Sequence, residues 1–194
     1  GEAQRLIVEA KEKGFKGEAF DQLQKQILNK NPERKPERPN FLKEQLRKLI
    51  TLYRHGKLYK ALDLGTQLSK QFPRDPITPN VCGVIFATLG NYKLAIENYQ
   101  KAIRLSPSSA DAYNNLGVTY LKIGDAISAI TSFKKATQLQ PGHADAYNNL
   151  GNCMGHISNY QDARTLYKKA IQLSPKFSNA FNNLGTSLRK IGHM

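Results

Sequence analysis

Amide side chains recur in adjacent pairs in the C-terminal half of the chain. The stretch "ADAYNNLG" occupies residues 110–117 and recurs unchanged at 144–151, and its variant "SNAFNNLG" occupies 178–185, so that successive copies are evenly spaced. An asparagine side chain offers two N–H donors and one carbonyl acceptor. Amides repeated at a fixed interval could therefore hydrogen-bond to the backbone of an extended peptide without requiring particular side chains in that peptide.

Residue types that serve catalysis or metal binding are present but are not grouped for either purpose. The four histidines fall mostly at expected turns and helix ends, and Cys82 and Cys153 stand far apart with no other cysteine in the chain. No phosphate-binding glycine loop, nucleophile elbow or HExxH motif occurs. We therefore expect no catalytic residues, no metal site and no cofactor, and we interpret the chain as a non-enzyme that takes no small-molecule substrate.

Composition limits the remaining classes of protein. The 194 residues are 40% hydrophobic, and 29 basic residues against 15 acidic ones give a net charge of +14. No apolar run is long enough to span a membrane, and the charged residues among the first twenty are atypical of a signal peptide. We therefore expect a cytoplasmic location and an attraction to acidic partners such as nucleic acid, anionic membranes or acidic proteins.

Apolar spacing predicts that each asparagine pair lies on the first helix of a helical hairpin. In residues 110–123 the apolar side chains recur every three to four residues until Gly124, and a second helical run ends at Pro141. Gly117, Ala129 and Ala136 are small where the neighbouring helix must approach closely. One hairpin cannot bury its apolar face alone, so successive hairpins should stack.

The full repeat carries a recognisable pattern. Residues 113–120 read Y-x2-L-G-x2-Y, followed by Ala129-x3-Phe133 and Pro141, and related residues recur 34 positions before and after. This resembles the tetratricopeptide repeat family, over roughly residues 42–194. The resemblance implies an all-α fold, a right-handed superhelical solenoid of antiparallel helix pairs. Its units would be about 42–75, 76–109, 110–143, 144–177 and a truncated 178–194. In the first unit, Leu49 replaces the expected glycine and Gly65 the expected aromatic residue.

The ends of the chain need separate interpretations. Residues 1–40 are expected to form a helical hairpin that could be a degenerate repeat, followed by the charged, proline-rich linker "NKNPERKPERPN" at 29–40, with the array covering 41–194. The last unit stops after its first helix, which would leave Phe181, Leu184 and Leu188 partly uncovered. That helix could cap the array or associate with a second copy, but we favour a fragment of a longer protein, whose remainder could be a glycosyl- or sulfotransferase.

The resemblance also implies where the asparagines lie, because in this family the polar side of each first helix lines the concave wall of the solenoid. The wall would carry one row of asparagines at the first position of each pair, a second row at the second position, and several polar neighbours. The first row is Asn80, Asn114, Asn148 and Asn182, the second is Asn115, Asn149 and Asn183, and the neighbours are Asn152, Lys122, His156, Arg189 and Lys190.

These rows are similar to the asparagine rows in the tetratricopeptide array of O-GlcNAc transferase, where the rows hold protein substrates. Asn115, Asn149 and Asn183 match residue by residue, whereas Val81 breaks the second row in the preceding unit. The chaperone-tail clamp of the same family is not matched, because Asp111 and Asp145 stand where a clamp lysine would be.

We therefore predict a protein-interaction scaffold that binds an extended peptide or partner protein in an asparagine-lined groove. One alternative is the substrate-recruiting N-terminal region of a larger transferase. A second is a basic convex surface, formed by lysine pairs at 134–135 and 168–169, that binds nucleic acid or anionic membrane. A third is that the asparagines are only a soluble filling that caps or bonds locally.

Overall fold

The structure, a computed structural model, describes residues 38–192, so the predicted N-terminal hairpin and most of the linker lie outside the described residues. The chain divides into two compact units, residues 1–44 and 45–194, and the second carries the repeats. The described helices are α3 (Arg38–Arg54), α4 (Leu58–Gln71), α5 (Ile77–Thr88), α6 (Tyr92–Leu105), α7 (Ala110–Lys122), α8 (Ala126–Leu139), α9 (Ala144–His156), α10 (Tyr160–Leu173) and α11 (Ser178–Gly192). None of them is long and apolar enough to cross a membrane.

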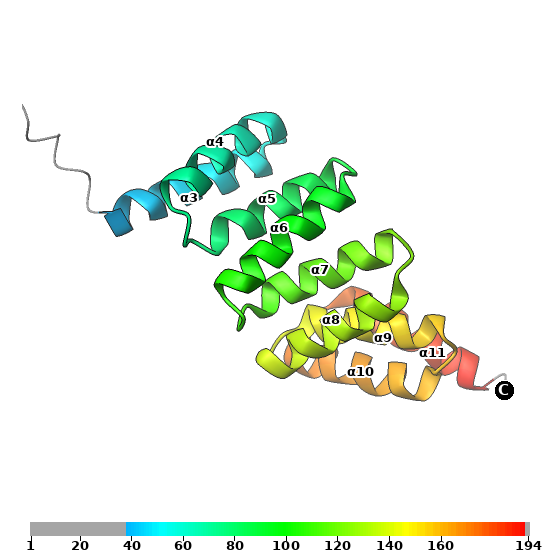
Figure 1. Cartoon of the computed structure of the whole chain (residues 1–194). Helices are drawn as coiled ribbons and strands as arrows, with labels where there is room; N and C mark the ends of the chain where they lie inside the picture. The colour runs from blue at the N-terminus through cyan, green and yellow to red at the C-terminus, as the bar shows by residue number, and fades with distance from the viewer. Residues whose placement is uncertain (1–37, 193–194) are drawn as a thin grey trace, which may run out of the picture. The chain divides into compact units, whose positions relative to one another are not determined.

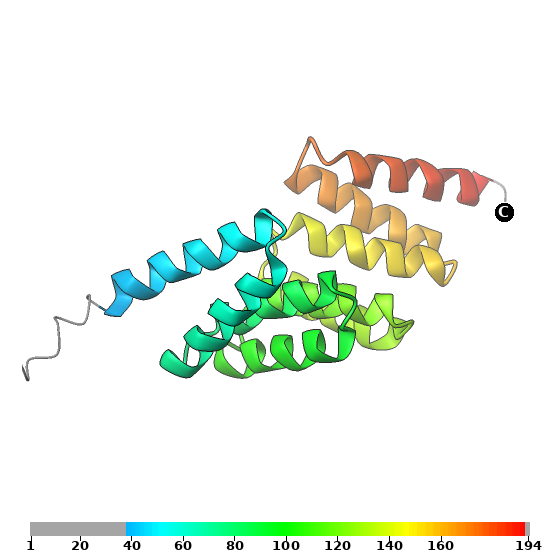
Figure 2. The same ribbon diagram turned by 90° about the horizontal axis from the view of Figure 1, so that it is seen from above.

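Consecutive helices of the second unit pair as hairpins and stack in chain order (Figures 1 and 2). Helix α5 packs on α6, α7 on α8 and α9 on α10, and each second helix also contacts the first helix of the next hairpin. The first helices α5, α7, α9 and α11 contact one another in series. The prediction of an all-α helical-repeat solenoid is confirmed, and the helices that carry the asparagine pairs lie side by side. The unit boundaries drawn from the sequence stay a prediction.

Close packing within three of the hairpins depends on a glycine that lies under an aromatic ring. A Cβ atom added at Gly117 would stand 2.7 Å from the Phe133 ring, and one added at Gly151 would stand 2.7 Å from the Tyr167 ring. The same contact recurs at Gly83, which meets Tyr99. Ala129 and Ala136, which were predicted to lie where neighbouring helices approach closely, are both 0% exposed. The spacing of small residues in the sequence thus predicted where the helices approach most closely.

The first hairpin of the second unit exchanges the large and the small residue between its two helices. Leu49 of α3 is 0% exposed, whereas Gly65 of α4 is buried at the position where the later hairpins have an aromatic ring. A Cβ atom at Gly65 would lie 3.8 Å from Leu49 Cδ1 and in collision with Cys82 Sγ. The departure from the repeat pattern is therefore a compensated exchange of volumes, and not a loss of packing.

Side-chain caps fix where five of the helices begin. The side chains of Asn91, Ser109, Asp125, His143 and Asn159 each accept a hydrogen bond from the backbone N–H three residues later. Such caps satisfy one of the N–H groups that a helix leaves without an internal partner. At α8 the bonds to Ser128 also lower the pKa of Asp125, because they stabilise its charged form.

The turn inside each hairpin uses a left-handed backbone conformation. Gly56, Gly90 and Gly124 have φ values of 70°, 76° and 82°, and the equivalent residue of the fourth hairpin, Ser158, has φ 62°. A side chain with a Cβ atom costs about 1–2 kcal/mol in this region, whereas glycine enters it freely.

We predict that Ser158→Gly raises the free energy of unfolding by about 1 kcal/mol, because it removes this backbone strain. The reciprocal change at an equivalent turn, Gly124→Ser, should lower it by a similar amount. Urea titration followed by circular dichroism measures both values. A Ser158→Gly protein less stable than the wild type would contradict the strain assigned to this turn.

Both cysteines are free and buried, as expected from their isolation in the sequence. Burial raises the pKa of the Cys82 thiol from 9.0 to about 11, and burial raises that of Cys153 to about 11 as well. The reactive species of a cysteine is its thiolate. Native protein should therefore react with a thiol reagent at pH 8 far more slowly than urea-unfolded protein does, as measured by absorbance of the released chromophore. Equal native and unfolded rates would contradict the burial.

The raised pKa values of the two thiols also predict how the free energy of unfolding changes with pH. A thiol whose pKa is higher in the folded protein keeps its proton more tightly there, so its contribution is complete below about pH 9 and is lost as the pH rises towards 11. The urea midpoint is therefore expected to fall between pH 9 and pH 11.

Candidate functional site

Every residue predicted for the concave wall lies on a first helix of a hairpin. Asn80 is on α5, Asn114, Asn115 and Lys122 are on α7, Asn148, Asn149, Asn152 and His156 are on α9, and Asn182, Asn183, Arg189 and Lys190 are on α11. The asparagines are drawn together because these four helices contact one another in series.

The asparagines bond to one another from hairpin to hairpin. Asn115 Nδ2 donates to Asn80 Oδ1 over 3.3 Å, and Asn149 Nδ2 donates to Asn114 Oδ1 over 3.1 Å. The third bond, at 3.0 Å, runs from Asn183 Nδ2 to Asn148 Oδ1. Each bond joins a second-row amide to the first-row amide of the preceding hairpin. We call these three bonds and their six residues the asparagine ladder.

The ladder bonds fix which atoms of each amide stay available. At Asn80 and Asn114 the carbonyl oxygen accepts the ladder bond, so the N–H₂ group of each amide stays available. At Asn115 and Asn149 one N–H donates the ladder bond, so the carbonyl oxygen and the second N–H stay available. Among the described residues, no further side-chain bond occupies these groups, which we call outward. The first row therefore offers chiefly N–H donors, and the second row offers carbonyl acceptors as well.

Solvent access differs along the ladder. Asn80, Asn114, Asn115 and Asn149 are half-buried, which holds their amides in place while leaving part of each in contact with solvent. Asn148 is only 6% exposed, so this amide serves chiefly as the acceptor that orients its second-row partner. The first-row donors that are both accessible and oriented by a ladder bond are therefore those of Asn80 on α5 and Asn114 on α7.

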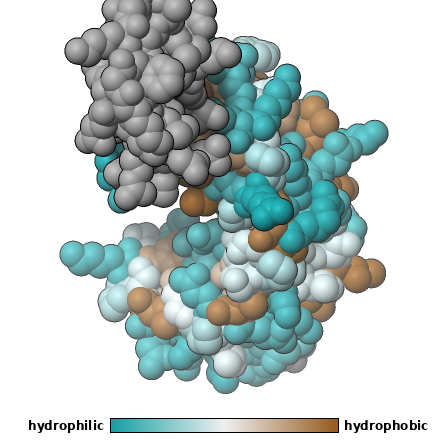
Figure 3. Space-filling view, turned by 60° about the vertical axis from the view of Figure 1, so that its left-hand side comes forward, coloured by the Kyte–Doolittle hydropathy of each residue, from teal (hydrophilic) through white to brown (hydrophobic). Residues whose placement is uncertain are grey.

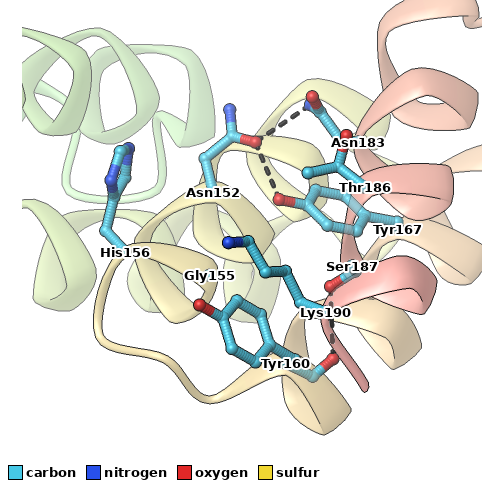
Figure 4. Close-up of a pocket in the computed structure, with 9 residues that line it drawn as sticks. All are labelled: Asn152, Gly155, His156, Tyr160, Tyr167, Asn183, Thr186, Ser187 and Lys190. Atoms are coloured by element: carbon cyan, nitrogen blue, oxygen red, sulfur yellow. Dashed lines mark hydrogen bonds between the residues drawn. The ribbon is translucent and has the colours of Figure 1, made fainter. Parts of the chain in front are cut away.

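The ladder branches between α9 and α11, where it borders a pocket of about 270 Å³ (Figure 4). Asn152 Oδ1 accepts two hydrogen bonds, both 2.9 Å long, from Tyr167 Oη and Asn183 Nδ2. Burial raises the pKa of Tyr167 to about 12, so its hydroxyl keeps its proton and acts as a donor. Because both lone pairs of the Asn152 oxygen are occupied, the orientation of this amide is fixed.

Basic and polar groups surround this pocket. Figure 4 shows Lys190 extending from α11 past Tyr160 towards Asn152 and Gly155, with His156 on the opposite side. The full lining is Asn152, Gly155, His156, Tyr160, Tyr167, Asn183, Thr186, Ser187 and Lys190. No acidic side chain lines it, so its chemistry suits a polar or anionic group of a ligand.

The structure separates some of the predicted site residues from this cluster. Lys122 and Arg189 are exposed and line neither the ladder nor the pocket, and Asn182 is exposed with no ladder bond among the described residues. Conversely, Tyr167 belongs to this cluster but was not predicted there, because its regular recurrence in the sequence is typical of a core aromatic residue. The available signal was the polar residue Asn152, which directly follows the glycine that the Tyr167 ring covers.

The lysine pairs that suggested a basic surface lie on second helices. Lys134 and Lys135 of α8 are exposed and border a shallow pocket of about 460 Å³ with Tyr113 and Gln138. On α10, Lys168 is exposed and Lys169 is half-buried. Figure 3 shows one face of the molecule, where hydrophobic residues form separate patches among hydrophilic ones. In the described part of the chain, no group of three or more His, Cys, Asp or Glu residues could hold a metal ion.

Two family models match the middle of the array, which contains Asn114, Asn115, Asn148 and Asn149 of the ladder but neither Asn80 nor Asn183. The family model described as TPR repeat matches residues 83–124, and the model described as tetratricopeptide repeat matches residues 108–176. No curated protein sequence matches the chain.

Solved structures with the same arrangement of helices include MamA, which is 27% identical, with a TM-score of 0.66 over 73% of this chain and 83% of that one. YrrB, described as a TPR protein with an unusual peptide-binding site, is 19% identical, with a TM-score of 0.61 over 74% of each chain. The first TPR of Spaghetti (RPAP3), bound to the HSP90 peptide SRMEEVD, is 20% identical, with a TM-score of 0.59 over 60% of this chain and 93% of that one. The two family matches place residues 83–176 in the tetratricopeptide repeat family, and the likenesses to solved structures show that the chain has the same fold.

Proposed function

We propose that the chain is a protein-interaction scaffold that binds an extended peptide along the asparagine ladder. The observation that carries this proposal is the orientation of the amides by the inter-hairpin bonds Asn115–Asn80 and Asn149–Asn114. An extended peptide presents carbonyl acceptors and N–H donors in alternation. The outward N–H groups of the first row suit the carbonyls, and the outward oxygens of the second row suit the N–H groups.

Pre-organisation makes these amides better ligands than freely rotating asparagines. Immobilising a freely rotating side chain on binding costs about 0.5–1.5 kcal/mol of free energy. The ladder bonds already immobilise these amides in the folded protein, so peptide binding does not incur that loss. Because the groups recognise backbone, the peptide's sequence would be selected elsewhere in the groove. The pocket beside Asn152 and Lys190 is placed to contribute such selection at the α9–α11 end of the ladder.

Two structural relatives support binding as the use of this fold, since YrrB is described as having a peptide-binding site and the Spaghetti repeat was solved with an HSP90 peptide. The acidic tail of that kind of peptide is not the ligand we propose. Asp111, whose side chain is 75% exposed, and the exposed Asp145 each precede an asparagine pair and would repel a string of acidic residues.

The test removes the outward N–H donors of the first row but keeps the ladder bonds. In the Asn80→Asp, Asn114→Asp double variant each carboxylate still accepts the ladder bond from Asn115 or Asn149, but the outward N–H₂ group becomes an acceptor. Peptides are first selected on the wild-type protein from a displayed library of random linear sequences. The Kd of the selected peptides is then measured for both proteins by isothermal titration calorimetry.

We expect the double variant to bind at least tenfold more weakly and to keep an unchanged urea midpoint. Each substitution removes a donor to a peptide carbonyl and puts in its place a carboxylate oxygen, which repels that carbonyl. The matched control is Gln100→Glu with Gln138→Glu, which makes the same amide-to-carboxylate change at exposed positions of α6 and α8. Equal affinities for the wild type, the double variant and the control would refute the ladder as the binding site. Failure to select any peptide would refute peptide binding by the array.

A further inference from the structure

Half of the exposed large hydrophobic side chains in the described part of the chain lie at one edge of the second unit. This edge is formed by the turns inside the hairpins, at residues 55–57, 89–91, 123–125 and 157–159, which Figure 1 shows one after another along one side of the stack. We call these turns, with the three residues on either side of each, the turn edge. Its exposed apolar side chains are Tyr59 at 79%, Ile123 at 49%, Ile127 at 81% and Ile157 at 57% exposure.

The packing of the helices does not require apolar side chains at these positions. Ile123 and Ile157 are the C-cap residues of α7 and α9, and the equivalent residue of the first hairpin is the exposed His55. Ile127 of α8 corresponds to the exposed Gln161 of α10. Polar side chains thus fit both places in the repeat. Exposed apolar residues that gather in one region mark an interaction surface more often than scattered ones do.

Basic residues are interleaved with these apolar ones, and all of them are exposed. They are Arg54, Lys57, Lys60, Lys93 and Lys122. Among the described residues, none of the five has an acidic partner within ion-pair distance. Two acidic residues share the turn edge, and both accept local hydrogen bonds, since Asp125 caps α8 and Asp162 accepts from Asn159 Nδ2. The turn edge therefore presents positive charge beside its apolar side chains.

Three kinds of occupant differ in what they require of such an edge. Nucleic acid would use the lysines, but its phosphate contacts depend on charge and leave the isoleucines without a role. A protein partner needs a continuous surface of about 800 Å² with an apolar centre, whereas here the apolar side chains are divided among three turns. The interface of a bilayer accepts separate apolar side chains and holds lysines and tyrosines at the level of the headgroups. Anionic headgroups also match the charge of the edge.

We propose that the turn edge binds the surface of an anionic lipid bilayer. Ile123, Ile127 and Ile157 enter the boundary between headgroups and acyl chains, and the lysines of the turn edge contact headgroup phosphates. Asn80 and Asn114 lie in the first halves of α5 and α7, away from the turns that follow these helices. The asparagine ladder therefore stays open to a peptide while the turn edge is on a bilayer.

Vesicles of defined composition test the proposal on the whole chain. One set contains equal parts of phosphatidylcholine and phosphatidylglycerol, and the other contains phosphatidylcholine alone. Both are loaded with sucrose, and bound protein is measured by sedimentation. The apolar variant changes three residues of the turn edge to serine: Ile123, Ile127 and Ile157. Its matched control makes the same change at three exposed aliphatic residues elsewhere: Ile77, Val118 and Leu188.

A second pair of variants tests the charge. The edge-lysine variant changes three residues to glutamine: Lys57, Lys93 and Lys122. Its matched control makes the same change at three exposed lysines of second helices away from the turns: Lys134, Lys135 and Lys168. Both variants lose the same net charge, so a difference in binding reports where the lysines lie. Circular dichroism and the urea midpoint establish that each variant is folded.

We expect the wild type to bind the anionic vesicles and not the neutral ones. The apolar variant should bind at least tenfold more weakly, while its control binds like the wild type. The edge-lysine variant should bind at least tenfold more weakly than its own control, because attraction to an anionic surface is worth about fivefold for each lysine that reaches it.

No binding to anionic vesicles would overturn the proposal. Binding that the apolar variant leaves unchanged would overturn it as well, because charge alone would then explain the attraction. Equal losses in the two lysine variants would assign the binding to the charge of the whole unit and not to the turn edge. Self-association of the wild type that the apolar variant abolishes, measured by analytical ultracentrifugation, would assign the edge to a second copy. The apolar variant keeps all six residues of the asparagine ladder, so these results are independent of peptide binding.

Discussion

Replacing Phe133 with alanine is expected to lower the free energy of unfolding by about 3–5 kcal/mol, the usual cost of removing a fully buried phenylalanine. Phe133 is 0% exposed and lies in one core cluster with Leu150, Cys153 and Met154 of α9. Its ring also covers Gly117 within its own hairpin. The side chain therefore joins two successive hairpins, and its loss should weaken their interface as well as the hairpin that contains it.

In a repeat protein, stability is close to a sum of repeat terms and nearest-neighbour interface terms. Weakening the interface between the third and fourth hairpins should therefore split the urea transition of Phe133→Ala into two steps. Urea titration followed by circular dichroism, with tyrosine fluorescence as a second probe, measures this. Thr131→Ala, at an exposed position of the same helix, should change stability by at most about 0.5 kcal/mol. A loss below about 1 kcal/mol for Phe133→Ala would contradict the packing described.

Two glycines of α9 are expected to respond to alanine in opposite directions. At Gly151 the new methyl group would lie 2.7 Å from the Tyr167 ring, so overpacking should cost about 1–3 kcal/mol even after the gain in helix propensity. At Gly155 the nearest atom would be Tyr167 Oη at 3.7 Å, an ordinary contact, so Gly155→Ala should raise stability by about 0.5–1 kcal/mol.

The pair provides its own control, because the chemical change and the helix are the same and only the neighbouring atoms differ. Urea midpoints for both variants measure the effect. If both substitutions were stabilising, the approach of α10 to α9 would be looser than the structure shows. If both were destabilising, the open space at Gly155 would be wrong.

Much of the fold follows from spacing in the sequence. The regular recurrence of Gly117, Ala129 and Phe133 predicts hairpins with a close approach at fixed positions, and the structure places these residues there. The exchange between Leu49 and Gly65 was visible as two departures from the pattern. That they compensate each other could be seen only once the two side chains were placed across the hairpin.

The asparagines were predicted to lie together, but their bonds to one another were not. Asn149 and Asn115 occupy equivalent positions of successive repeats, so the repeat period alone suggests that these two side chains are neighbours. The bond instead joins Asn149 to Asn114, across the two rows. Which residues of adjacent first helices meet depends on how the helices pack in three dimensions, and sequence periodicity does not specify that. The asparagines thus stabilise the stack, a use that neither the peptide-binding nor the local-capping interpretation included.

The side-chain amide protons of the ladder provide the most direct test of its proposed function. In protein labelled with ¹⁵N, addition of a selected peptide should shift the Nδ2 resonances of Asn80 and Asn114 strongly and slow their exchange with water. The Nδ2 resonance of Asn98, which donates to Leu94 O on α6 away from the ladder, should stay unchanged. A peptide that saturates the protein while the amides of Asn80 and Asn114 stay unchanged would contradict the account.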